Sequence, residues 1–345
     1  MPPRYSPMSR KGRSSCRRRT ERRTPNAEFA DLTQPYRHEL LAYCYRMLGS
    51  HEDAEDLVQE TYLRAWRGYD GFQARSSVRT WLYRIATNAC LTALAHRGRR
   101  VLPSGLDAAS ANPYATPRSG DNRVEWLGPL PDTLVTSAAD DPATVAATRD
   151  SLRLALIATL QHLSGRQRAV LILRDVLDFP AAEVADLLGT STAAVKSTLQ
   201  RARSRLGGLA HAAAHRSEPT DPRGRALLDE YITAFETADA TLLERILHRD
   251  AVIEMPPSRT WFSGKRTCVA YLATQVLDAS GAWRMLPTAV NGQPAAAAYH
   301  RDDTGAYAAF GIAVLTTGSG AIAHITVFGD PELVRHCGFA AHHAP

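Results

Sequence analysis

Basic, amide and hydroxyl side chains recur on one face of the segment that follows Gly189. These side chains belong to Thr192, Lys196, Ser197, Gln200, Arg201 and Arg203. Arginine can form paired hydrogen bonds with guanine, and glutamine with adenine, in the major groove of DNA. Lys196, Gln200 and Arg203 would share one face of a helix, whereas Thr192 and Arg201 are better placed for phosphates. The set predicts binding to duplex DNA.

Three short helices over residues 163–206 are needed to present that face. Pro180 is expected to start the second helix, Gly189 to end it, and Ser191 or Thr192 to cap the third. The apolar residues of the third helix recur at helical spacing, at Val195, Leu199, Ala202 and Leu206. A helix, a glycine turn and a basic second helix form a helix-turn-helix. This agreement favours DNA binding over an amphipathic hairpin with a solvated charged face.

Length and composition indicate a multidomain protein of the reducing cytosol. The chain has 345 residues, 44% of them hydrophobic, which is enough for two or three cores. Its five cysteines are scattered without metal-ligand spacing, so we expect neither a disulfide framework nor a metal site. Residues 1–23 hold nine Arg or Lys and one Glu, a net +8, so the remainder of the +6 chain is near −2 (6 − 8). Residues 1–28 are therefore expected to form a basic, disordered tail.

Two further helices carry contrasting polar groups. The segment 53–72 has an acidic surface, which composition alone interprets as an aid to solubility. Its apolar stripe comprises Leu57, Val58, Thr61, Ala65 and Trp66. The segment 76–100 interleaves arginines with Trp81, Tyr83 and Asn88. Basic groups can follow a phosphate backbone while aromatic and amide groups bind exposed bases. Either aromatic residue taken alone is more simply a core residue.

Three strings then identify a family resemblance: CYRMLGSHEDAEDLVQETYLRAW, FQARSSVRTWLYRIATNACL and LSGRQRAVLILRDVLDFPAAEVADLLGTSTAAVKSTLQRARSRL. They resemble regions two and four of the extracytoplasmic-function sigma factors of the sigma-70 family. The resemblance covers roughly residues 29–100 and 149–207, and the two motif blocks stand in the family's order. It implies an alternative sigma subunit that binds core RNA polymerase through the beta-prime and beta subunits and recognises and opens promoter DNA.

The resemblance assigns roles to three groups of residues. The polymerase-binding face would comprise Asp56, Gln59, Glu60 and Leu63. The minus-ten element would be bound and melted by Arg75, Arg79, Trp81, Tyr83, Arg84 and Asn88. The minus-thirty-five element would be bound by Thr192, Lys196, Ser197, Gln200, Arg201 and Arg203. Opening DNA requires unstacking of bases, and pockets that capture the flipped bases offset that cost.

Residues 101–148 are rich in Pro and Gly, a composition that predicts a linker. Its patch EWLGPLPD, with Trp126 and Leu127, is the part most suited to docking. Docking on a neighbouring domain of the same chain is as consistent with the sequence as docking on polymerase.

The tail over 222–335 places helices before four strand-like runs, WRMLPTAV, PAAAAYH, AYAAFGIAVLTT and AIAHITVFG, which indicates an α+β fold. Three pieces of the tail, DAVIEMPP, WFSGKR and ITVFGDPEL, resemble the SnoaL-like, nuclear-transport-factor-two-like cone, a fold that hosts both enzymes and binding modules. Asp250, Trp261 and His324 are candidate pocket residues. His324 is alternatively a polar residue that faces water from an edge strand.

We expect a multidomain chain: a tail over 1–28, sigma region two over 29–100, a linker over 101–148, a helix-turn-helix region four over 149–210 and a SnoaL-like regulatory domain over 222–335. The two sigma regions should be all-α and the last domain α+β. The function expected is a cytoplasmic sigma factor, not an enzyme, without catalytic residues, cofactor or metal. The alternative is a helix-turn-helix regulator fused to a ligand-binding or enzymatic domain. An anti-sigma factor or a small ligand is a further candidate partner, and no membrane is expected.

Overall fold

The computed structural model describes residues 25–72, 76–118, 120, 123–136, 141–210 and 222–343. Of the predicted basic tail only residues 25–28 are described, and they belong to helix α1 (Pro25–Thr33). Helical structure therefore begins slightly before Phe29. In the described part of the chain, no helix has the length and apolar character needed to cross a membrane.

Four helices form the module that the resemblance assigns to sigma region two, the first sigma module: α1, α2 (Arg37–Leu48), α3 (His51–Gly68) and α4 (Val78–Ala95). Gly49 ends α2 in the left-handed region, with φ of 73°, where a glycine carries no steric penalty. Ser50 then caps α3 by accepting a hydrogen bond from the Asp53 amide, and Ser77 caps α4 in the same way. Leu40, Tyr43 and Leu82 are fully buried between these helices.

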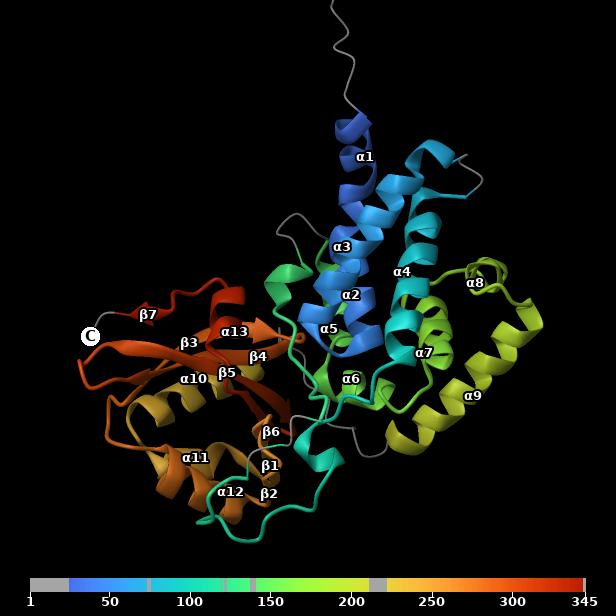
Figure 1. Cartoon of the computed structure of the whole chain (residues 1–345). Helices are drawn as coiled ribbons and strands as arrows, with labels where there is room; N and C mark the ends of the chain where they lie inside the picture. Colours follow the sequence, from blue (N-terminus) through green and yellow to red (C-terminus); the bar gives the residue numbers. More distant parts are fainter. Residues whose placement is uncertain are drawn as a thin grey trace, which may run out of the picture.

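The second module holds the predicted helix-turn-helix. It comprises α6 (Leu154–Leu160), α7 (Gly165–Leu171) with a π turn at Ile172–Val176, α8 (Ala181–Leu187) and α9 (Thr192–Ala210). Pro180 precedes α8 and Gly189 has φ of 59° in the turn after it. The Ser191 hydroxyl accepts from the Ala194 amide, which caps α9 as expected. Figure 1 shows α9 on the outer side of the molecule, away from the sheet.

The C-terminal domain is a curved sheet with helices, as predicted. Its elements are α10 (Pro222–Glu236), α11 (Ala240–Ile246), β1 (Leu247–Glu254), β2 (Trp261–Ser263), α12 (Lys265–Tyr271), β3 (Trp283–Val290), β4 (Gln293–Arg301), β5 (Tyr307–Gly318), β6 (Ala321–Phe328), α13 (Pro331–His336) and β7 (His342–His343). The strand order is β2-β1-β6-β5-β4-β3, with β7 paired to β5. β1 and β6 run parallel, and the other paired strands run antiparallel.

Strand β4 is buried on both faces of the sheet. Along β4, Ala296 and Ala298 face a core formed with α10, α11 and α12. The alternating residues Ala295, Ala297 and Tyr299 instead join the core that contains both sigma modules. A strand covered on both faces is apolar at consecutive positions, which explains the run of alanines in β4. The sheet therefore packs directly against the sigma modules.

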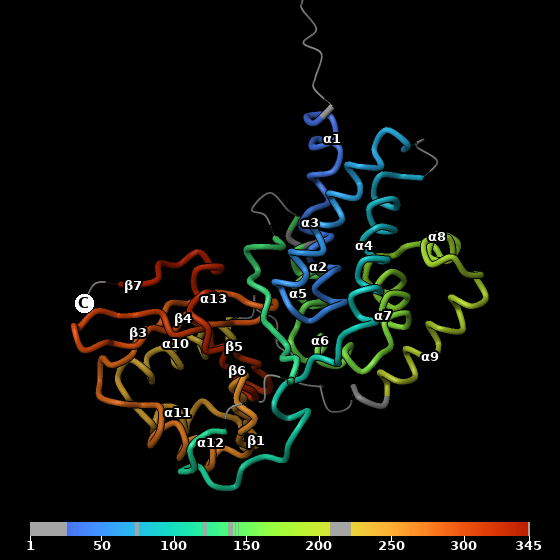
Figure 2. Tube along the Cα trace, viewed as in Figure 1, coloured from blue at the N-terminus to red at the C-terminus, as the bar shows by residue number. Residues whose placement is uncertain are grey.

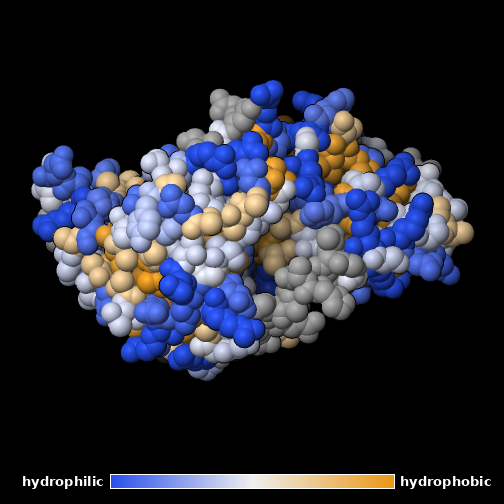
Figure 3. All heavy atoms as spheres, turned by 90° about the horizontal axis from the view of Figure 1, so that it is seen from below, coloured by the Kyte–Doolittle hydropathy of each residue, from blue (hydrophilic) through white to orange (hydrophobic). Residues whose placement is uncertain are grey.

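The linker follows the surface of the C-terminal domain before it returns to region four. Its first part runs beside α12 and β1, as the trace in Figure 2 shows. The Ser110 amide donates to the Trp261 carbonyl, and Asp107 forms an ion pair with Arg259. Helix α5 (Pro142–Asp150) ends the linker. Hydrophilic residues cover most of the face in Figure 3, and smaller apolar areas lie on both halves of the molecule.

The docking patch EWLGPLPD lies against the first sigma module in this structure. Leu127 and Leu130 are buried, the Gly128 amide donates to the Gly49 carbonyl, and the Tyr45 hydroxyl donates to the Gly128 carbonyl. Of the two docking alternatives left open by the sequence, the structure therefore contains the one within the chain.

Candidate functional site

One exposed face of α3 carries the residues expected to bind polymerase. Asp56, Gln59 and Leu63 are exposed, and Glu60 is half-buried in an ion pair with Arg64 at 2.6 Å. Their spacing places the four side chains on one side of the helix. The side chain of Leu63 is 56% exposed, which is unusual for a large apolar residue on a folded surface.

A groove of about 520 Å³ adjoins this face. Gln59 and Leu63 line it together with Phe29, Tyr62 and Trp66. The rings of Phe29 and Trp66 meet edge to face with centroids 5.2 Å apart, and Trp66 remains 39% exposed. The sequence pattern assigned Trp66 to the apolar stripe and did not reveal that aromatic residues line this groove. Tyr62 and Trp66 lie one helical turn beyond Gln59 and Leu63, a spacing that could have indicated it.

The residues expected to bind the minus-ten element divide into two groups along α4. Arg84 and Asn88 are exposed one turn apart, and Trp81 is half-buried, stacked on Phe72 with ring centroids 4.6 Å apart. Arg75 lies outside the described residues. The outer part of this face is therefore available to a ligand.

Arg79 and Tyr83 form the second group, and region four covers them. Phe179, just before α8, packs edge to face on Tyr83 with centroids 5.0 Å apart, and the Arg79 guanidinium lies 4.3 Å from the same Phe179 ring. Tyr83 is completely buried. Burial lowers the pKa of Arg79, but the hydrogen bonds and charge of Glu39 outweigh it and raise the pKa overall. Thr80 also donates a hydrogen bond to Glu183 of α8 at 3.1 Å.

Helix α9 presents the predicted base-reading groups to solvent. Thr192, Lys196, Ser197, Gln200, Arg201 and Arg203 are all exposed. Val195 and Ala202 on the opposite face are buried against the rest of region four. Arg203 forms two hydrogen bonds with the Asp175 carboxylate, at 2.6 and 2.9 Å, so this guanidinium has a partner before any DNA binds.

None of the three candidate pocket residues lines the large cavity of the C-terminal domain. Asp250 is exposed on β1 beside Arg249, and the Trp261 indole donates to the Asp107 carbonyl of the linker at 2.8 Å. His324 lies on β6 between β1 and β5, and so it is not on an edge strand. Its Nε2 is 2.8 Å from Oε1 of Glu254.

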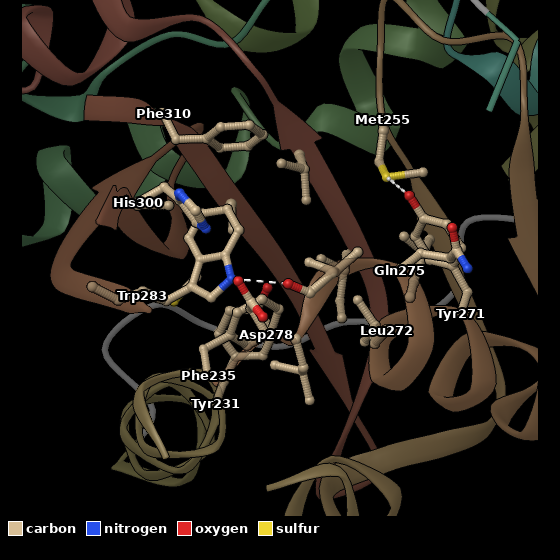
Figure 4. Close-up of a pocket in the computed structure, with 18 of the residues that line it drawn as sticks. Tyr231, Phe235, Met255, Tyr271, Leu272, Gln275, Asp278, Trp283, His300 and Phe310 are labelled. Carbon is tan, nitrogen blue, oxygen red and sulfur yellow. Dashed lines mark hydrogen bonds between the residues drawn. The ribbon is translucent and has the colours of Figure 1, made fainter. Parts of the chain in front are cut away.

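Glu254 links that histidine to the linker. Its carboxylate is fully buried and accepts hydrogen bonds from the backbone amide and the hydroxyl of Ser104, each at 3.0 Å. Burial raises the pKa of Glu254, but the contacts with His324 and Ser104 outweigh it and leave the pKa lowered. Trp261 and His324 therefore belong to the docking of the linker. The cavity of the domain, shown in Figure 4, has other walls.

A helical module with an exposed docking helix, a basic-aromatic helix and a helix-turn-helix module together define a sigma factor. The models for Sigma-70 region 2 and Sigma-70, region 4 match residues 17–100 and 153–206. The chain belongs to the extracytoplasmic-function RNA polymerase sigma factors. It is 50% identical over 317 residues to the ECF RNA polymerase sigma factor SigG of Mycobacterium tuberculosis, a match that covers 90% of this chain and 84% of that protein.

A second relative includes the same domain order. The chain is 30% identical to the ECF RNA polymerase sigma factor SigJ of Mycobacterium tuberculosis over 65% of this chain and 62% of that protein. The crystal structure of that SigJ matches with a TM-score of 0.56 at 23% identity, over 90% of this chain and 98% of that one, which shows a shared fold. The predicted function is confirmed: the protein is an alternative sigma factor that binds core RNA polymerase and promoter DNA, and it is not an enzyme.

Proposed function

We propose that this structure is a closed form of the sigma factor, in which the C-terminal domain holds region four against the minus-ten face of region two. Promoter opening then requires release of that contact. The observation that carries the proposal is the position of Asn291. This residue lies in the turn between β3 and β4 and is fully buried where both sigma modules and the linker meet.

The side chain of Asn291 binds three segments. Its Nδ2 donates to the Tyr45 hydroxyl of region two at 2.7 Å and to the Leu152 carbonyl, just before α6, at 2.6 Å. Its Oδ1 accepts from the Leu130 amide of the linker at 2.9 Å, and its own amide donates to the Leu130 carbonyl. The buried Asn291 amide holds region two, the linker and the start of region four in fixed relative positions. Moving any of the three would leave a buried polar group without a hydrogen bond, which costs free energy.

Asn291 and the two residues after it form the junction between the C-terminal domain, the linker and region four. The Gly292 amide donates to Asp132, whose carboxylate also binds Arg149 at 3.1 Å. Gln293 accepts a hydrogen bond from the Leu154 amide at the start of α6. The turn of the sheet therefore anchors the start of region four, and region four in turn covers Arg79 and Tyr83. Tyr83 is out of reach of DNA in this form, and the half-buried Arg79 is held by the Phe179 ring and by Glu39.

We assign the residues of the three faces the roles that the family resemblance implies. Asp56, Gln59, Glu60 and Leu63 bind polymerase, the α4 residues from Arg79 to Asn88 and the preceding Arg75 act on the minus-ten element, and the α9 residues bind the minus-thirty-five element. The exposure of α3 and α9 supports the first and third assignments. The protein acts in the cytoplasm, where the polymerase and promoters are, and an anti-sigma factor remains a candidate partner.

Promoter-specific run-off transcription with core polymerase tests the closed form. Asn291→Ala and a truncation after Gly208 should both raise open-complex formation relative to the full chain. The matched control is Asn112→Ala, because Asn112 is an exposed asparagine of the linker. Unchanged output from both variants would rule out restraint by the C-terminal domain. A loss of output with retained folding would instead mean that the domain activates.

A further inference from the structure

A cavity of about 590 Å³ lies inside the C-terminal domain, between the sheet and the helices α10 and α12 (Figure 4). Its volume falls within the range of small-molecule sites, roughly 300–1,000 Å³. None of the residues that bind the linker or the sigma modules lines it. It is therefore a separate feature from the junction at Asn291.

Aromatic side chains from several elements form the walls. Tyr231 and Phe235 come from α10, Tyr271 from α12, Trp283 from β3 and Phe310 from β5. Figure 4 shows Trp283, His300 and Phe310 together on one side, with Tyr271 and Met255 on the other. Phe310 remains 41% exposed. Flat apolar walls on both sides suit a ligand with rings, because aromatic groups stack or meet edge to face.

The charges around the cavity disfavour an anionic ligand. No lysine or arginine lines it, and its one carboxylate, that of Asp278, is exposed to solvent. His300 also lines the cavity, but a carboxylate or phosphate placed inside would lose its water without gaining the permanent charge of a lysine or arginine, which is costly. The Trp283 indole already donates to the Val276 carbonyl at 2.9 Å, so it is not free for a ligand.

Tyr231 supplies a polar group without a protein partner. The residue is 1% exposed, lines the cavity, and has no hydrogen bond from its hydroxyl to any described residue. Burial raises the pKa of Tyr231, so the phenol stays neutral and keeps its proton. The second phenol, that of Tyr271, donates only to the sulfur of Met255 at 3.3 Å, which is a weak acceptor. The Tyr231 hydroxyl is not one of the fully buried side-chain atoms that lack a partner, so it is open to the space of the cavity, where a ligand oxygen can accept from it.

We propose that this cavity binds an uncharged, ring-containing hydrophobic molecule with a ketone or hydroxyl oxygen, and that Tyr231 donates a hydrogen bond to that oxygen. The apolar walls bury the rings. The hydrogen bond from the Tyr231 hydroxyl favours ligands that carry the oxygen. The site stands independently of the closed form, because its walls and the unpaired hydroxyl are local to the C-terminal domain.

The test uses the full chain and a matched set of naphthalenes. The neutral fluorophore N-phenyl-1-naphthylamine reports occupancy, and 2-acetylnaphthalene, 2-ethylnaphthalene and 2-naphthoate compete for it. We expect the ketone to displace the fluorophore best and the carboxylate to be at least about tenfold weaker. Tyr231→Phe should weaken the ketone about fivefold and leave the hydrocarbon unchanged.

Two further variants complete the design. Tyr114→Phe removes the hydroxyl of an exposed tyrosine outside the cavity and should change nothing. Ala313→Phe places a ring inside the cavity and should abolish fluorophore binding; circular dichroism checks that the variant folds. The proposal fails if the folded wild-type chain does not bind the fluorophore. It also fails if the carboxylate competes as well as the ketone, or if Tyr231→Phe leaves the ketone-to-hydrocarbon ratio unchanged.

Discussion

Arg79 of region two and Phe179 of region four share a cation-π contact of 4.3 Å between the guanidinium carbon and the ring centroid. Arg79 is expected to act on the minus-ten element, and in this structure a side chain of region four contacts it instead. Because Phe179 also packs on Tyr83, one aromatic ring contacts two side chains that we expect to act on the promoter.

Phe179→Leu keeps an apolar side chain at this position but removes the ring from Arg79 and Tyr83. We expect tighter binding of single-stranded minus-ten DNA by the full chain, by severalfold, since a cation-π contact of about 1 kcal/mol no longer competes. Fluorescence anisotropy of a labelled oligonucleotide measures this. Phe310→Leu serves as the control, because Phe310 lies on the C-terminal domain. Equal affinity in the wild type and Phe179→Leu would contradict the covering role.

Gly292 and Gly320 allow the junction to be tested separately from backbone strain. Both have positive φ, 63° and 77°, so alanine is strained at either position. A Cβ at Gly292 would also lie 2.4 Å from the Arg149 carbonyl, whereas one at Gly320 meets nothing within 4 Å. Gly292→Ala should therefore lower the thermal midpoint more than Gly320→Ala, which should cost about 1 kcal/mol. Equal shifts would mean that the turn at Gly292 is not tightly held.

The groove beside Leu63, which we expect to bind polymerase, predicts a strong effect of a change at its apolar rim. Leu63→Asp should weaken binding of core polymerase at least about tenfold, since truncated or charged hot-spot residues typically lose about 2 kcal/mol or more. Surface plasmon resonance with immobilised core enzyme provides the measurement. Leu106→Asp is the matched control, because Leu106 is an exposed leucine of the linker. The double variant Gln59→Ala with Glu60→Ala should also weaken binding of core polymerase. If its affinity is that of the wild type, the docking face lies elsewhere on the protein.

Two α9 residues should behave differently on DNA. Gln200→Ala should lower affinity for the cognate minus-thirty-five element by about 1–3 kcal/mol and relax the preference at one base pair. Arg201→Ala should weaken all sequences alike and reduce the salt dependence by about one counterion, because the exposed Arg201 is placed for a phosphate. Affinity measured over a salt series on cognate and scrambled duplexes separates the outcomes. Identical profiles for the two variants would show that Gln200 does not read bases.

A histidine pair makes the contact between α3 and α13 sensitive to pH. His51 Nε2 is 3.3 Å from His336 Nδ1. Burial, and next the charge of His336, lower the pKa of His51, while Glu52, the Pro129 carbonyl and Asp330 oppose this. Below its ordinary pKa of about 6.5, His51 is protonated more in the unfolded than in the folded chain, so the contact loses stability as pH falls through that range.

Hydrogen exchange of the α13 amides at about pH 7.5 and pH 5.5, corrected for intrinsic rates, measures that loss. His51→Gln should reduce the pH dependence of protection. His38→Gln, which changes an exposed histidine of α2, should leave it as in the wild type. Retention of the full pH dependence in His51→Gln would assign the effect to other groups.

Local patterns determined most of the elements and the family. Ser191 caps α9 and Gly189 follows α8, as the spacing indicated, and the run WRMLPTAV is β3 residue for residue. Such signals are short-range, because caps, turns and periodicity depend on neighbours within one or two helical turns. The exposed face of α9 followed from the same periodicity.

Only the tertiary structure decided which elements meet. The alanines of β4 are compatible with a strand buried on both faces, but nothing local indicates that one face packs on sigma helices. His324 and Trp261 have the chemistry of a pocket, yet long-range packing joins them to Glu254 and Asp107 for the docking of the linker. Arg79 and Tyr83 likewise have the chemistry of promoter binding, and their covering by Phe179 depends on residues nearly a hundred positions away. Contacts at such separation arise from the packing of complete surfaces, which residue spacing within one segment does not encode.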